Sequence, residues 1–96
     1  MNIENVEFET LDAEAQLLTD MVMRVSIIGR GLEQIATPII AAVGNEPLIF
    51  VMPLLNGTGG ITGMLEHSPA SGDAVRVGYL DGELIDTGFS FQPANV

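Results

Sequence analysis

The sequence predicts an α+β fold: an N-terminal amphipathic helix over about residues 12–28, followed by a small, mainly antiparallel sheet. Three observations predict it. Apolar residues recur at helical spacing early in the chain, short apolar runs bounded by Gly and Pro follow, and an Asp-Gly pair separates the last two runs. Because the chain has 96 residues and no long linker, we expect a single domain over residues 1–96.

The helix prediction depends on one apolar stripe. Thr10 or Asp12 can cap its start, and Gly29 supplies a stop. An alternative makes Met21–Ile28 a strand, because this segment is rich in Val and Ile. The members of the stripe follow one another at three- and four-residue steps: Leu17, Leu18, Met21, Val22, Val25 and Ile28.

The most apolar part of the chain is Ile35–Leu55, which carries one charge, and we expect the other elements to cover it. A second short helix is expected near Thr37, with Pro38 as its first residue. The run of five apolar residues from Leu48 is typical of a strand buried on both faces.

The two ends of the chain predict strands. Residues 1–10 alternate weakly between apolar and acidic side chains, which favours an edge strand or an arm that docks on a neighbour. A frayed terminus is the alternative. Near the other end, Asp81-Gly82 separates two apolar runs and predicts a C-terminal β-hairpin with a type I′ turn. That turn would place Val77 opposite Asp86.

Composition excludes several function classes. The net charge is −10, with three Arg and no Lys, so we expect neither a nucleic-acid partner nor binding to an anionic membrane. The absence of Cys excludes thiolate chemistry. No secretory signal and no convincing transmembrane segment is recognisable, so we expect the protein in a virion or in the cytoplasm.

Two segments were considered for chemistry. His67 is the only histidine, and Glu66, Ser68, Ser71 and Asp73 lie near it in sequence, but their spacing matches no catalytic motif. The Gly57–Gly60 loop resembles phosphate-binding loops in composition but lacks the Lys that such loops require. We therefore expect no enzyme activity, no cofactor and no metal.

Hydrophobic residues make up 47% of this small chain, more than a lone domain of its size readily buries. The first hypothesis is a non-enzymatic, self-associating structural protein, such as a virion component that decorates or forms a phage head shell, which binds copies of itself and a larger protein assembly. The alternative is a small acidic inhibitor or antidote that binds a basic, nucleic-acid-processing partner. A second alternative is a small ligand-binding domain or enzyme that uses His67 or the Gly57–Gly60 loop. For the first hypothesis, the expected interface residues are Val6, Phe8, Phe50, Met52, Phe89 and Phe91.

Overall fold

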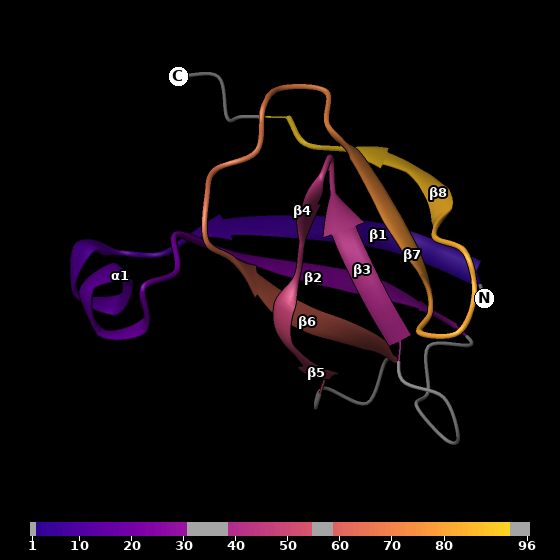
Figure 1. Cartoon of the computed structure of the whole chain (residues 1–96), viewed down its shortest axis with the longest axis horizontal. Helices are drawn as coiled ribbons and strands as arrows, with labels where there is room; N and C mark the ends of the chain where they lie inside the picture. The colour runs from indigo at the N-terminus through magenta and orange to yellow at the C-terminus, as the bar shows by residue number, and fades with distance from the viewer. Residues whose placement is uncertain (1, 31–38, 55–58, 93–96) are drawn as a thin grey trace.

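Two antiparallel sheets pack face to face in the computed structural model, which describes residues 2–30, 39–54 and 59–92 (Figure 1). The prediction of an α+β fold with a long N-terminal helix is wrong, because the described residues form mostly strands and one short helix. Sheet A contains, in spatial order, β1 (Asn2–Thr10), β2 (Met23–Arg30), β6 (Gly60–Leu65) and β5 (Ile49–Pro53). Sheet B contains β4 (Glu46–Pro47), β3 (Ile39–Val43), β7 (Ala74–Tyr79) and β8 (Ile85–Ser90).

The second half of the expected helix is strand β2, as the alternative for Met21–Ile28 indicated. Its side chains alternate, with Met23, Val25 and Ile27 buried and Arg24 exposed. The helical stripe omitted Met23 and Ile27, although both lie in the core. Hydrogen bonding to β1 on one side and to β6 on the other favours the extended form over a helix that would bury a single stripe.

The helix that does form, α1 (Ala13–Thr19), is short and stands at one end of the sheets (Figure 1). Asp12 caps it, as predicted: its carboxylate accepts a hydrogen bond of 2.8 Å from the Ala15 N–H. Asp20 ends it in the left-handed conformation, with φ of 60°. No helix among the described residues is long and apolar enough to cross a lipid bilayer.

The core lies between the sheets and draws on both. β1 contacts β8, and at this edge the rings of Phe8 and Phe91 meet edge to face, with centroids 5.0 Å apart. The edge strand expected over residues 1–10 is confirmed as β1. The core side chains buried most completely come from four strands, β2, β3, β6 and β7: Val25, Ile27, Ile39, Val43, Ile61, Leu65, Val75 and Val77.

Within Ile35–Leu55, a second short helix was expected, but Ile39–Val43 is strand β3, so this prediction is wrong for these residues. Its expected start at Thr37 and Pro38 lies outside the described residues. The strand after Leu48 exists as β5, but it is not buried on both faces. It forms an edge of sheet A, and Phe50 and Met52 are exposed.

The C-terminal hairpin is present as β7 and β8, but its turn differs from the expected type I′. Neither Asp81 nor Gly82 has a positive φ, which a type I′ turn requires at both positions. Instead the Gly82 N–H donates to the Tyr79 carbonyl at 2.9 Å. The longer connection shifts the register by one residue, so that Val77 pairs with Ile85.

Replacing Ile27 by Ala is expected to lower the free energy of unfolding by about 2–5 kcal/mol, because this side chain is fully enclosed between the sheets. Leu18→Ala is the matched control. The Leu18 side chain is 77% exposed, so its loss should change stability by less than about 0.5 kcal/mol. Urea unfolding measures both variants, and a larger loss for Leu18→Ala would contradict the strand assignment of residues 23–30.

Gly60→Ala is expected to destabilise the fold by about 1 kcal/mol or more. Gly60 has φ of +137°, and a Cβ there would lie 2.5 Å from the carbonyl oxygen of Ile27. Gly82→Ala should be tolerated, since Gly82 is outside the left-handed region and only the Tyr79 carbonyl oxygen, at 3.8 Å, is near the added atom. Thermal unfolding of both variants tests the difference, and equal losses would contradict the close approach of β6 to β2.

Candidate functional site

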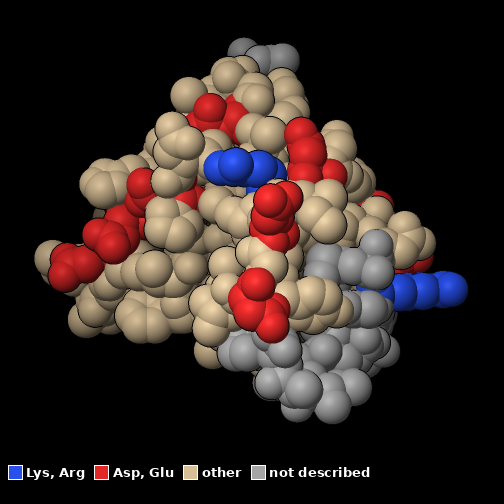
Figure 2. Space-filling model, turned by 45° about the vertical axis from the view of Figure 1, so that its right-hand side comes forward, with Lys and Arg blue, Asp and Glu red and all other residues tan. Residues whose placement is uncertain are grey.

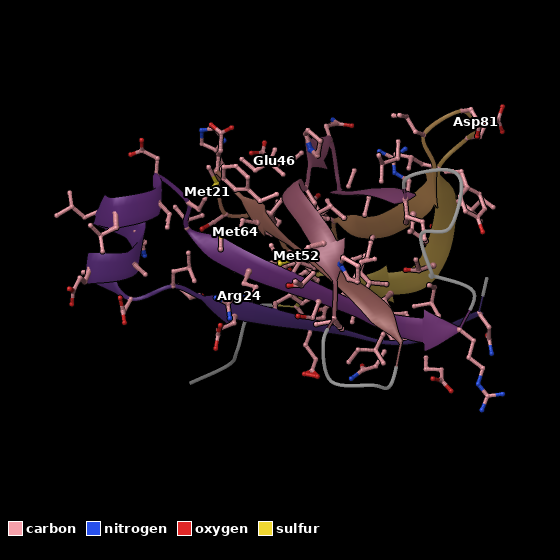
Figure 3. The ribbon with its side chains drawn as sticks, turned by 90° about the horizontal axis from the view of Figure 1, so that it is seen from below. Met21, Arg24, Glu46, Met52, Met64 and Asp81 are labelled. Carbon is pink, nitrogen blue, oxygen red and sulfur yellow. The ribbon has the colours of Figure 1, made fainter. Side chains whose placement is uncertain are left out.

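A groove of about 450 Å³ lies on the outer face of sheet A, beside the edge strand β5. We call it the outer groove. Arg24, Met52 and Met64, labelled in Figure 3, come from β2, β5 and β6, so three adjacent strands contribute to it. The residues that line it are Arg24, Ser26, Phe50, Met52, Pro53, Leu54, Thr62, Gly63 and Met64.

Strand alternation places these side chains on the outer face. Because Met23, Val25 and Ile27 point into the core, the intervening Arg24 and Ser26 must point outward. On these neighbouring strands the Ser26 and Thr62 hydroxyl oxygens lie 3.3 Å apart. The same pleat that buries one face of β2 therefore builds the floor of the outer groove.

Phe50 has an unusual backbone for a bulky residue. Its φ is +54°, in the left-handed region, and the pairing of β5 with β6 is irregular between Ile49 and Met52. The Phe50 side chain is nevertheless 64% exposed and Met52 is 52% exposed. A strained backbone that displays an aromatic ring to solvent, rather than burying it, is a feature that often marks a functional surface.

The structure separates the six expected interface residues into two groups. Phe91 is buried, and Val6, Phe8 and Phe89 are partly buried and pack against the core. Phe50 and Met52 instead lie together at the outer groove. Arg24 and Met64, which also line the outer groove, are not among those six residues. A helix over residues 12–28 gives Arg24 no neighbouring strand, and the sequence predicts no strand around Met64.

The charge around the outer groove differs from that of the rest of the chain. Of the described residues, Arg24 is the one charged residue that lines it, in a protein of net charge −10. The Arg24 guanidinium lies 3.4 Å from a carboxylate oxygen of Glu9, and both side chains are well exposed, so this ion pair is weak. On the face drawn in Figure 2, acidic side chains are spread among neutral ones rather than joined in one patch.

His67 lies elsewhere, and its neighbour in space was not among those considered from the sequence. Its Nδ1 lies 2.9 Å from the Oε1 of Glu46, a residue 21 positions earlier in the chain. Asp73, one of the candidates, instead accepts a hydrogen bond from the Ala70 N–H in its own turn. The hydrogen bond to Glu46, the charge of Glu46 and, less strongly, the charge of Glu66 raise the pKa of His67.

The Gly57–Gly60 loop is only partly described. Gly57 and Thr58 lie outside the described residues, whereas Gly59 and Gly60 have positive φ and pack closely against β2. This close packing explains in structural terms why glycine occupies both positions. Within residues 2–30, 39–54 and 59–92, no three His, Asp or Glu side chains gather closely enough to hold a metal ion.

Comparisons with protein-family models, curated proteins and solved structures find no match to this chain.

Glu46→Gln is expected to lower the pKa of His67 toward its ordinary value of 6.5, because the neutral amide removes the charge that favours the imidazolium. Since the folded-state pKa is raised, the stabilisation by protonated His67 is complete below pH 6.5 and disappears as the pH rises through the folded-state pKa. An NMR titration of the His67 ring protons measures this, with Glu66→Gln as the control that should shift it less. Equal midpoints in the native protein and Glu46→Gln would contradict the pair.

Proposed function

We propose that this chain is a non-enzymatic structural protein that self-associates through the outer groove and takes part in a larger assembly, such as the shell or decoration layer of a virion head. The observation that carries this proposal is the exposure of Phe50 and Met52 beside an apolar groove whose described lining includes no acidic residue. Burying such a side chain contributes about 1.5–3 kcal/mol. Association therefore buries apolar side chains that an isolated copy leaves exposed to water.

Net charge supports this choice of surface. Each copy carries a net charge of −10, so two copies repel one another over most approaches. Among the described residues, the lining of the outer groove has one Arg and no acid, so repulsion between copies is reduced at this face, where Phe50 and Met52 also offer apolar contact. Contact across the face is favoured over strand addition at β5, because its irregular pairing and Pro53 are features that protect sheet edges.

Light scattering coupled to size exclusion tests the proposal. The native protein at micromolar concentration is expected to show a multiple of the 10.2 kDa chain mass, and high salt should not dissociate it. Phe50→Asp is expected to give a folded monomer, since the side chain is exposed and Asp tolerates the left-handed backbone better than most residues. Circular dichroism confirms that the variant is folded.

Ile85→Asp is the matched control. Ile85 is as exposed as Phe50, at 65%, but it lies on β8 in sheet B, so its substitution should leave the mass unchanged. A native protein that is monomeric at micromolar concentration would overturn the proposal. Binding of that monomer to a basic protein, lost steeply with salt, would favour the acidic inhibitor instead.

A further inference from the structure

We infer that helix α1 of one copy docks in the outer groove of another copy, through Leu17 and Leu18. This inference rests on the proposed self-association and specifies its contact. Leu17 and Leu18 are adjacent, and they are 82% and 77% exposed. They lie on a helix with no buried residue, which stands away from the two sheets (Figure 1).

The shape of α1 suits a protruding contact. The helix is capped at both ends, by Asp12 and by the left-handed Asp20, whose N–H donates to the Gln16 carbonyl. Gln16 also donates from its side chain to the Leu11 carbonyl at 2.8 Å, and Leu11 is buried. The helix is thus held to the body of the protein while its two leucines face solvent, so docking them requires little further ordering.

The charges of the two surfaces are complementary. Asp12, Glu14 and Asp20 flank the leucines, and residues 12–20 contain no Lys or Arg. Among the described residues, Arg24 is the one charged side chain in the lining of the outer groove, and its partner Glu9 on β1 is not part of that lining. Because the Arg24–Glu9 pair is exposed and weak, Arg24 is free to exchange Glu9 for an acid of an incoming helix.

The two surfaces also complement each other in form. The helix offers a convex pair of leucines, and the groove offers a hollow between the side chains of Phe50, Met52 and Met64. Methionine side chains adapt readily to an apolar partner. Each copy carries both surfaces, so the contact joins unlike patches and either closes reciprocally in a pair or continues from copy to copy.

A mixing experiment tests the contact. The helix variant combines Leu17→Gln with Leu18→Gln, which keeps a good helix former at both positions and removes the apolar surface. The groove variant is Phe50→Asp. Each variant alone is expected to associate at least about tenfold more weakly than the native protein in sedimentation velocity measurements. An equimolar mixture should recover a complex, because the intact helix of the groove variant can enter the intact groove of the helix variant.

The outcomes separate the two proposals. If the native protein associates and the helix variant associates equally well, the helix contact is overturned while self-association through the groove stands. If both variants are monomeric and their mixture recovers no complex, the pairing of helix with groove is also overturned. If the native protein itself is monomeric, the proposed function is overturned, and the helix contact with it. Ile85→Asp is the control for mixing. It keeps both the helix and the groove intact, so it should form a complex with either variant.

Discussion

Burial of alternate side chains between two sheets is the interaction on which the rest of this structure depends. Eight side chains, contributed by β2, β3, β6 and β7, are almost completely removed from water there. At about 1.5–3 kcal/mol each, their burial is comparable to or larger than the net stability of about 5–15 kcal/mol that small proteins retain. The core segment of β2 therefore keeps a two-residue period, and the side chains at its intervening positions face outward.

The outer groove is a consequence of that constraint. Arg24, Ser26, Thr62 and Met64 are outward because their neighbours are inward, and β5 adds apolar side chains at the edge where sheet A ends. Residues 2–30, 39–54 and 59–92 form two layers and no third layer that covers this face. The high apolar content thus divides into a core that the fold buries and a remainder that it leaves exposed, at the groove, on α1 and around the β7–β8 hairpin.

Charge limits how this remainder can be covered. Thirteen acids against three Arg make most encounters between copies repulsive. The outer groove is an exception among the described residues, because its lining contains Arg24 and no acid, although Glu9 pairs with Arg24 beside it. The acidic helix α1, with its two exposed leucines, matches it in both charge and apolar character. Apolar content and acidity, which seem opposed in the composition, thus support the same kind of contact.

Sequence patterns alone were enough to place a helix cap at Thr10 or Asp12, to favour a strand near the N-terminus and to predict a hairpin near the C-terminus. The structure has Asp12 as the cap, β1 at the N-terminus and the β7–β8 hairpin. The cap and the hairpin depend on residues close together in sequence. The sequence also identified Phe50 and Met52 as candidate contact residues. It could not decide between helix and strand for residues 21–28, because Met21 and Val25 fit both periods. That decision came from partners distant in sequence, β1 and β6, whose pairing with β2 rewards the extended form. The same long-range pairing decided that Leu17 and Leu18 are exposed and that the lining of the outer groove comes together.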